Sequence, residues 1–424
     1  MSTGIHPDST WAPLYGAQTE LAMDNFPPRG RTFGDFPPLV RGYAQVKLAA
    51  ARANQALGVL DEQRCDAITT ACQEILDGEH AGQFPTALVH GGGGTTANMN
   101  VNEVIAARAA ELAGATVHPN DHVNASQSTN DTYPTAMALA LLSQVEAPVA
   151  ALNRLADALE SKAAEFDTTH RLGRTCLQDA VTLTAGDTHR AQAAAVHRTA
   201  GVLEAATHAL TTVPVGATAV GTGIGAPAHF AERCAEELAR LTGLPISASE
   251  NPYDSLAHFD PYAHIASAGA RAAITMAKIA ADVRLLSSGP RGGFGELTIP
   301  AVQAGSSIMP AKVNPVIPEY VMQLSYRVRG SAHTVECAVA AGELELNVME
   351  PVILDALSNI FEDLAAAATT FTERCVLGLN WNGPHRERNL AGALDRWVEM
   401  SATRGYESAT AELRAGGSDG GTAR

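Results

Sequence analysis

The sequence is poor in aromatic side chains and in cations. Phe, Trp and Tyr make up 5% of the 424 residues, whereas hydrophobic residues in total make up 46%. Much of this hydrophobic content is alanine and leucine, which favours packed helices over β-sheets. Twenty-nine basic residues face 45 acidic ones, for a net charge of −16. Nucleic acid and anionic membranes are therefore poor partners, and an anionic substrate would need local positive charge.

Cysteine is also scarce, and targeting signals are missing. The six cysteines lack the paired spacing of a zinc site, which is typical of reduced thiols in a cytoplasmic protein. The first residues have neither a basic head nor an apolar run, so we expect no signal peptide. No apolar stretch of about 18 residues is evident, so we expect no membrane span. These features predict a soluble cytoplasmic protein.

Long stretches of the chain have helical spacing of apolar residues. Residues 1–40 are rich in proline and are expected to be irregular, and residues 416–424 are expected to be disordered. Such long helices, apolar on more than one side, require a bundle and neighbouring chains to cover the remaining faces. The sequence thus predicts an obligate oligomer with helices over residues 40–76 (broken near Gly58), 98–112, 134–166, 188–210, 226–241, 262–286, 318–341 and 351–372.

Three other segments resemble known binding motifs only in part. Four glycines at 91–94 suggest a phosphate loop, but no Gly-Lys-Ser/Thr follows them. The glycines of residues 216–223 lack the βαβ context of a dinucleotide site. His118 and His122 could ligate a metal, but no helix is predicted there to present them together. We therefore predict no metal site and no nucleotide cofactor.

Polar residues gather at four glycine- or proline-marked ends of the predicted helices. One of these places holds three short hydrogen-bonding side chains in a row, although a helix cap needs only one of them. Together the clusters contain a single cation and many neutral donors, which suits a small molecule rich in carboxylates. Their members are Thr95 and Thr96; Ser128, Thr129 and Asn130; Thr175 and Cys176; and Ser306, Ser307, Lys312 and Asn314.

The last of these clusters predicts a catalytic loop. Ser306 and Ser307 lie in a flexible segment that follows glycine-rich residues 287–295, and Lys312 and Asn314 lie where this segment meets the next helix. A serine is a poor base unless its alkoxide is stabilised by a nearby cation, backbone amides or a helix N-terminus. A loop that closes over substrate also excludes water and strengthens charge interactions inside.

Residues 305–315 closely resemble the signature loop of the fumarase/aspartase superfamily. The resemblance covers nearly the whole chain and is strongest to its aspartate ammonia-lyase members, through residues 98–106, 126–131, 173–175 with 177–181, 216–223 and 344–351. It implies an all-α, three-domain fold with a central bundle of long helices. The implied domains are residues 1–130, residues 131–375 and a shortened C-terminal domain of residues 376–424, ending in a disordered tail.

The same resemblance implies a mechanism and an assembly. Members of the family are homotetramers in which three subunits contribute to each active site, and they use no cofactor for the chemistry. The resemblance implies the same for this chain. Ser306 would remove a proton beside one carboxylate of a succinate-type substrate, and fumarate would be released. Asn130 would face the leaving group. The enediolate intermediate would be stabilised by Thr95, Ser128, Thr129 and Ser307, and the other carboxylate would be held by Thr175, Lys312 and Asn314.

Two departures from the family pattern leave the leaving group open. Many relatives carry histidine at the position of Cys176, and fumarases pair it with the glutamate that matches Glu319, so a hydratase is disfavoured. Residues 187–190 also differ, and His189 or Arg190 could favour an anionic leaving group such as nitrite, although an ordinary solvated surface residue is the simpler interpretation of Arg190. We therefore predict a C–N lyase acting on aspartate or on an N-substituted succinate such as nitrosuccinate, with Cys176 and Arg190 as possible leaving-group contacts. The alternatives are a fumarate hydratase and a non-catalytic structural relative, like the lens crystallins of this superfamily.

Overall fold

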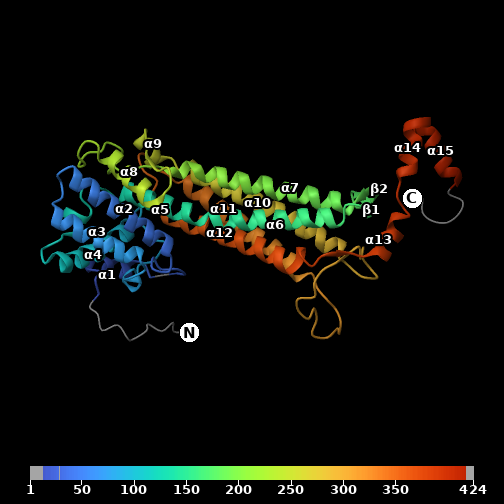
Figure 1. Cartoon of the computed structure of the whole chain (residues 1–424), viewed down its shortest axis with the longest axis horizontal. Coiled ribbons are helices and arrows are strands. Elements are labelled where there is room, and N and C mark those ends of the chain that lie inside the picture. Colours follow the sequence, from blue (N-terminus) through green and yellow to red (C-terminus); the bar gives the residue numbers. More distant parts are fainter. Residues whose placement is uncertain (1–12, 28, 417–424) are drawn as a thin grey trace. The chain divides into compact units, whose positions relative to one another are not determined.

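The computed structural model describes residues 13–27 and 29–416, and helices dominate this range (Figure 1). The strands are short and form three two-stranded sheets in the described part of the chain. The all-α class predicted from the sequence is thereby confirmed. The disordered tail was predicted for residues 416–424; Gly416 is the last residue of a helix, and the rest of the tail lies outside the described residues.

Contacts within the chain group it into two compact units. The first consists of the chain up to Ala147, together with Val202–Ala270 and Arg327–Glu362. The second consists of Pro148–Gly201, Arg271–Tyr326 and the chain from Asp363 onward. The division into three domains stays a prediction.

The first unit is a cluster of helices in which α2 packs against α3, α5 and α8, and α3 packs against α4. Its strands β3 (Thr212–Val213) and β4 (Ser247–Ala248) pair in parallel. The helices are α1 (Ala17–Asn25), α2 (Pro37–Ala56), α3 (Glu62–Leu76), α4 (Thr95–Ala113), α5 (Thr129–Gln144), α8 (Phe230–Thr242) and α9 (Pro252–Ala257), with single turns η1 (Ala81–Gln83), η2 (Pro119–Val123) and η3 (His208–Thr211).

The second unit combines helix segments with two antiparallel sheets. Strands β1 (His170–Thr175) and β2 (Gln178–Thr184) form a hairpin, and β5 (Leu297–Thr298) pairs with β6 (Asn380–Trp381). Its other elements are most of α6 (Glu146–Glu165), the turn η4 (Thr372–Val376), α13 (Gly383–Leu390), α14 (Asp395–Arg404) and α15 (Tyr406–Gly416). Besides α6, the long helices that carry residues of both units are α7 (Ala185–Thr207), α10 (Asp260–Leu286), α11 (Val316–Val339) and α12 (Glu350–Phe371) (Figure 1).

The predicted long helices are present, but the helix predicted over 226–241 begins only at Phe230, and the one predicted over 134–166 is divided into α5 and α6. The helix predicted from Pro134 begins instead at Thr129, because Ser128 and Asp131 form a capping box at its N-terminus. The expectation that no stretch is long and apolar enough to span a membrane is wrong for Thr129–Glu165, which passes that test by length and composition. However, 61% of its most apolar window is buried inside the protein, as is usual for a core helix.

Residues 1–40 are not uniformly irregular, because they contain α1. The Glu103 carboxylate, from α4, accepts hydrogen bonds from the backbone N–H groups of Gly16, Gln18 and Thr19 and from the Thr19 hydroxyl. These are the N–H groups that a helix start leaves without partners, and a carboxylate there is favoured by the helix dipole. The cap comes from a residue far along the chain, so the local sequence does not reveal it.

A short π-helical turn, η2, forms at the two histidines where no helix was predicted. The His118 Nδ1 accepts hydrogen bonds from the backbone N–H groups of Asn120 and Asp121. The His122 Nδ1 accepts from the N–H of His118. The side chains thus stabilise the turn, because each Nδ1 takes a backbone donor that would otherwise lack a partner.

The buried side chain of Glu350 should make the stability of the folded protein depend on pH. It is fully buried at the start of α12, and neither carboxyl oxygen has a hydrogen-bond partner among the described residues. Burial raises the pKa of Glu350 to about 8, against roughly 4.3 for an unfolded chain. Between these two pH values the folded state holds one proton more than the unfolded state. The free energy of unfolding is therefore highest, as far as Glu350 is concerned, below about pH 4, and it declines as the pH rises to about 8.

We expect Glu350→Gln to remove this decline. The variant should be more stable than the wild type at about pH 8, by on the order of 5 kcal/mol, since each pKa unit of the shift corresponds to about 1.4 kcal/mol, and the difference should shrink toward about pH 4. Urea unfolding across this range measures it, with the exposed Glu345→Gln as the matched control. A wild-type-like decline in Glu350→Gln would show that Glu350 is not the group responsible.

Candidate active site

The predicted catalytic loop is closed at its base by Gly305, Lys312 and Asn314. The Gly305 N–H donates to the Lys312 carbonyl over 3.0 Å, and the Asn314 side-chain amide donates to the Gly305 carbonyl over 2.6 Å. A Cβ atom at position 305 would overlap the Lys312 carbonyl, so this close approach requires glycine. The Lys312 ammonium donates to the Asn314 Oδ1 over 2.8 Å. The spacing of the motif therefore has a geometric basis.

Ser306 sits in this loop with its hydroxyl oxygen already oriented. Its Oγ accepts hydrogen bonds from the backbone N–H groups of Ile308 and Met309, over 3.2 and 3.0 Å. Donors aimed at an oxygen favour its anionic form. The two amides would therefore stabilise the Ser306 alkoxide, which is the form that can act as a base. Ser307, beside it, is exposed.

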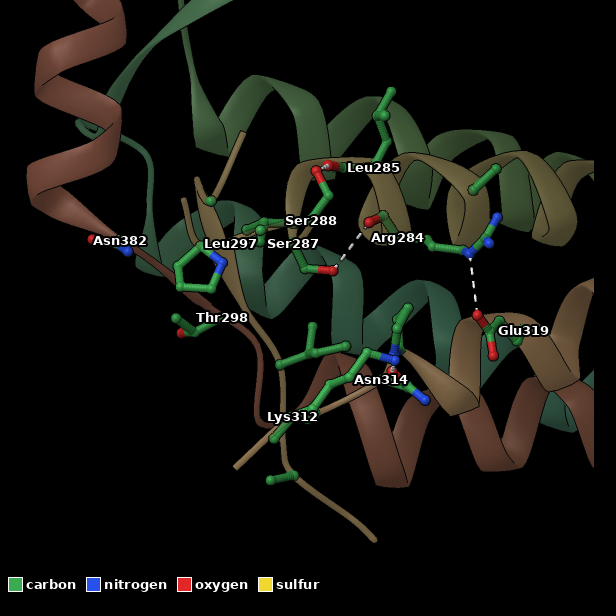
Figure 2. Close-up of a pocket in the computed structure, with 18 of the residues that line it drawn as sticks. Arg284, Leu285, Ser287, Ser288, Leu297, Thr298, Lys312, Asn314, Glu319 and Asn382 are labelled. Atoms are coloured by element: carbon green, nitrogen blue, oxygen red, sulfur yellow. Dashed lines mark hydrogen bonds and ion pairs between the residues drawn. The ribbon is translucent and has the colours of Figure 1, made fainter. Parts of the chain in front are cut away.

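Lys312 and Asn314 line a pocket of about 870 Å³ in the second unit. Figure 2 shows them on one side of it, with Arg284 joined to Glu319 across the other side. The Arg284 Nε lies 3.3 Å from the Glu319 Oε1. Ser306 and Ser307 do not line this pocket. Sequence reasoning missed several of its polar residues, namely Arg284, Ser287, Ser288, Thr298 and Asn382.

The signal that could have found Arg284 is its place in the sequence. It lies in the last turn of α10, directly before the serine- and glycine-rich residues 287–295. A cation there satisfies the C-terminal end of the helix dipole, which is its ordinary interpretation. Only the folded structure brings it beside Glu319 and into the same pocket as Lys312.

Thr175 and Cys176 lie at the tip of the β1–β2 hairpin, whereas the sequence placed them only among the polar residues near a predicted helix end. Thr175 pairs with Gln178, which leaves Cys176 and Leu177 as a two-residue turn with φ of 53° and 60°. Positive φ at both central residues is the geometry of a type I′ hairpin turn, usually made by asparagine and glycine. The hairpin was not predicted because this sequence lacks those residues. Cys176 is exposed.

A buried ion cluster anchors the hairpin through Arg174 and Glu296. The Glu296 side chain is fully buried, and its Oε1 accepts from Arg174 over 2.5 Å and from the Asn389 amide over 2.7 Å. The Arg171 Nε lies 3.8 Å from the Glu296 Oε2. The Arg174 guanidinium also lies over the Phe294 ring, 4.4 Å from its centre, a favourable cation–π arrangement. Thr175 is thus attached to a fixed support.

In the first unit, Thr95 is the first residue of α4 and is exposed, and Thr96 follows it. The residue before it, Gly94, has a φ of 83°, and a Cβ there would overlap the Tyr133 ring. The Thr95 hydroxyl donates to the Gly92 carbonyl over 2.8 Å. The prediction that these threonines stand at a helix start is confirmed, and the four glycines make the tight turn that leads into it.

Ser128, Thr129 and Asn130 each use their side chains differently. The Ser128 Oγ accepts from the Asn130 N–H over 3.2 Å as a helix cap, and its own hydroxyl hydrogen remains to donate. The Thr129 Oγ1 accepts from the Asn98 amide over 3.1 Å. The Asn130 amide donates to the Ala219 carbonyl over 2.8 Å. Capping therefore accounts for one of the three, as the sequence argument expected.

A network of buried polar side chains supports residues 128–130. The fully buried Lys47 donates to the Asn124 Oδ1 over 2.9 Å and to the Gln127 Oε1 over 3.0 Å. Burial lowers the pKa of Lys47 to about 7 and raises the pKa of Asp131 to about 7. Asp131 accepts backbone N–H groups of Ser128, Gly216 and Thr218, over 3.0, 3.1 and 2.8 Å. The segment at 216–223 thus serves as a backbone cradle for a carboxylate.

The predicted site residues therefore form two groups. Thr95, Ser128, Thr129 and Asn130 belong to the first unit, where Asn98 connects α4 with Thr129. Thr175, Cys176, Ser306, Ser307, Lys312 and Asn314 belong to the second. Their roles toward a substrate stay predictions.

Comparison with known proteins decides the family. A family model described as a lyase matches residues 8–330. Aspartate ammonia-lyase from Corynebacterium glutamicum is 44% identical over 375 residues, which cover 87% of this chain and 71% of the relative. The class II fumarate hydratase of Thermosynechococcus vestitus is 40% identical over 417 residues, covering 96% and 88%. The chain belongs to the fumarase/aspartase superfamily of lyases.

Solved structures of the superfamily agree in fold. A crystal structure of fumarate lyase:delta crystallin from Brucella melitensis has a TM-score of 0.91 at 41% identity, covering 96% of this chain and 90% of that chain. A recombinant class II fumarase from Schistosoma mansoni also has a TM-score of 0.91, at 33% identity, covering 95% and 88%. The fumarase-like fold predicted from the sequence is confirmed, and so is the assignment of the protein as a lyase.

Neither His189 nor Arg190, the two residues that raised the possibility of an anionic leaving group, offers an unpaired positive charge in this structure. His189 is buried, receives the Trp381 indole N–H at its Nε2 over 3.1 Å, and lies 3.0 Å from the Gln192 Oε1. Burial lowers the pKa of His189, which favours the neutral ring. Arg190 is exposed and forms ion pairs with Asp167 and Asp187, over 2.7 and 3.1 Å.

We expect Arg174→Met to destabilise the lyase by roughly 3 kcal/mol, because removing one partner of a buried ion pair leaves the other charge uncompensated. Arg171 still faces Glu296, which places the effect at the lower end of the usual range. Chemical denaturation measures the change, with the exposed Arg198→Met of α7 as the matched control. Equal stability of the two variants would mean that the Arg174–Glu296 pair does not anchor the hairpin.

Proposed function

We propose that this lyase cleaves the C–N bond of L-aspartate and releases fumarate and ammonia. The observation that carries the proposal is the identity of residue 176. It is a cysteine here, whereas the fumarases of this superfamily have a histidine at the matching position. A thiol is a weak hydrogen-bond donor and a poor proton relay at neutral pH. A departing hydroxide needs such a relay to be protonated. The amino group of aspartate is already protonated in the substrate and leaves as neutral ammonia without one.

A second observation supports the same choice. Glu319, which would pair with that histidine in a hydratase, pairs here with Arg284 at 3.3 Å. The Glu319 carboxylate thus contacts a guanidinium, where a hydratase would place an imidazole. At neither the Cys176 nor the Glu319 position does this chain offer the histidine–glutamate pair on which the hydratase mechanism rests.

In the proposed reaction, Ser306 takes the proton from the carbon beside one carboxylate of aspartate. The electrons move into that carboxylate, which becomes an enediolate with two negative charges. Donors aimed at such developing charge are worth about 3–4 kcal/mol each, and Thr95, Ser128, Thr129 and Ser307 would supply them. The C–N bond then breaks, with Asn130 facing the departing amine. The second carboxylate would be held by Thr175, Lys312 and Asn314.

We further propose a homotetramer whose subunits share each active site, with no cofactor in the chemistry. The proposed substrate-binding residues are divided between two units of the chain. In addition, α10 exposes Ile274 and Leu285, and long helices with exposed apolar residues are stabilised by a partner that covers them. Sedimentation at micromolar concentration should yield a tetramer, whereas a stable monomer would contradict the shared site.

A cytoplasmic location is also proposed. All six cysteines are free thiols in the described part of the chain, as expected in a reducing compartment.

Nitrosuccinate is the second candidate substrate, because Arg190 could contact an anionic leaving group such as nitrite. The ion pairs of Arg190 with Asp167 and Asp187 leave it little free positive charge to offer, and the buried His189 favours its neutral form. Ammonia is therefore the better-supported leaving group, with the thiol of Cys176 as its possible neighbour.

The test is to follow the ultraviolet absorbance of fumarate with L-aspartate, L-malate and nitrosuccinate in parallel. We expect the highest kcat/KM with L-aspartate, with ammonium formed in equal amount to fumarate. Faster turnover of malate would establish the hydratase, and nitrite release from nitrosuccinate as the preferred reaction would establish the alternative lyase. No fumarate from any of the three would support a non-catalytic structural relative.

A further inference from the structure

Helix α11 carries a histidine and a cysteine that face one another and that were not among the site residues described above. His333 and Cys337 are four residues apart, so they lie on the same face of the helix. The His333 Nε2 lies 3.7 Å from the Cys337 Sγ. Both side chains are exposed, and both belong to the first unit.

The separation of these two atoms matches the bite of a tetrahedral metal ion. Zinc binds imidazole nitrogen at about 2.0–2.1 Å and thiolate sulfur at about 2.3 Å. At a tetrahedral angle these two bonds place nitrogen and sulfur about 3.6 Å apart. The observed 3.7 Å therefore requires almost no movement of either side chain on binding.

The other ring nitrogen of His333 has the partner that metal-ligating histidines usually have. Its Nδ1 lies 3.4 Å from the Glu336 Oε2. A carboxylate at this position can accept the second ring N–H, which fixes the tautomer with Nε2 free to ligate. One turn of helix thus holds a nitrogen ligand, a sulfur ligand and the group that orients the nitrogen ligand.

We propose that His333 and Cys337 chelate a divalent transition-metal ion of the zinc or cobalt kind, with Glu336 orienting the imidazole. Imidazole with thiolate is a ligand pair that selects such ions over magnesium or calcium. On binding, the metal–sulfur bond forms as the thiol proton leaves to solvent, and water completes the coordination. None of these three residues is assigned a part in the elimination, so the site is separate from the lyase chemistry.

A second cluster of possible ligands, Glu74, Glu79 and His80, is distinguishable from this one. Their ligand atoms lie close together, but both Glu74 oxygens already accept from Arg108, over 2.7 and 2.8 Å. A guanidinium at that place repels a second cation. This cluster also lacks sulfur, so a metal bound there would give no thiolate signal.

The experiment is a titration of the reduced full-length protein with Co²⁺, in a non-coordinating buffer with a phosphine reductant. We expect a saturable thiolate-to-cobalt charge-transfer band in the near ultraviolet. Zn²⁺ should remove the band, because it binds nitrogen and sulfur sites more tightly than Co²⁺ does. Absence of the band at millimolar Co²⁺ would overturn the proposal.

Variants assign the band to its residues. Cys337→Ser should abolish it, whereas Cys176→Ser, which replaces the other exposed cysteine among the described residues, should leave it unchanged. Glu336→Gln should weaken Co²⁺ binding about 10- to 100-fold, as expected for loss of an outer-sphere partner. Unchanged lyase activity of Cys337→Ser shows that it is folded. A band that persists in Cys337→Ser would contradict the site.

Discussion

Ser306→Ala should lower kcat for fumarate formation by about 10²–10⁴-fold or more, the contribution of a positioned general base. The hydroxyl oxygen that would accept the substrate proton receives two backbone N–H groups, from Ile308 and Met309. These donors stabilise an alkoxide, and alanine offers no oxygen in their place. Because binding of the carboxylates is assigned to other residues, KM should change much less than kcat, as measured by fumarate absorbance.

The matched control for this variant is Ser161→Ala. Ser161 is an exposed serine on α6 whose hydroxyl contacts only its own helix, at the Asp157 carbonyl. It should retain full activity, and both variants should keep the sedimentation and circular dichroism of the wild type. If Ser306→Ala retained a kcat within tenfold of the wild type while folded, Ser306 would not be the base.

Lys312→Met should lower kcat/KM by about 2–4 kcal/mol of transition-state binding, roughly 30- to 1,000-fold. The chain has a net charge of −16, so a dicarboxylate depends on local cations. The other cation of the pocket, Arg284, is paired with Glu319. The Lys312 ammonium contacts only a neutral amide oxygen, that of Asn314, among the hydrogen bonds described. Its charge is therefore available to a carboxylate.

The matched control is Lys278→Met, which removes an exposed lysine of α10 that pairs with Asp282. It should leave kcat/KM unchanged and so account for the loss of one charge from the whole chain. The wild-type kcat/KM should also fall as ionic strength rises, and this dependence should be smaller in Lys312→Met, since salt screens the attraction. Equal kcat/KM of the two lysine variants would remove Lys312 from the carboxylate site.

Most of the helical fold could be predicted from the sequence because the relevant signals are local. Apolar periodicity located the long helices, and Gly58, with a φ of 75°, marked the break between α2 and α3. The helix α1 was missed because Glu103 caps it from α4. The β1–β2 hairpin was missed because its turn is made by Cys176 and Leu177, which do not favour positive φ.

The candidate site was predicted from motifs, but its supporting residues were not. Lys47, Asp131 and Glu296 are buried charged groups whose partners come from distant segments. A sequence gives the identity of such residues and not their partners, and nothing local distinguishes a buried lysine from a solvated one. Arg284 was missed for the same reason, since its pairing with Glu319 depends on how α10 and the start of α11 pack.

The most direct test of the proposed elimination is to run it backwards in heavy water. The lyase is incubated with fumarate and ammonium in D₂O, and the products are identified by proton NMR. The serine-base mechanism predicts L-aspartate carrying a single deuterium at one stereochemical position of the methylene carbon, with no malate. Deuterated malate as the main product, or aspartate without stereospecific deuterium, would contradict it.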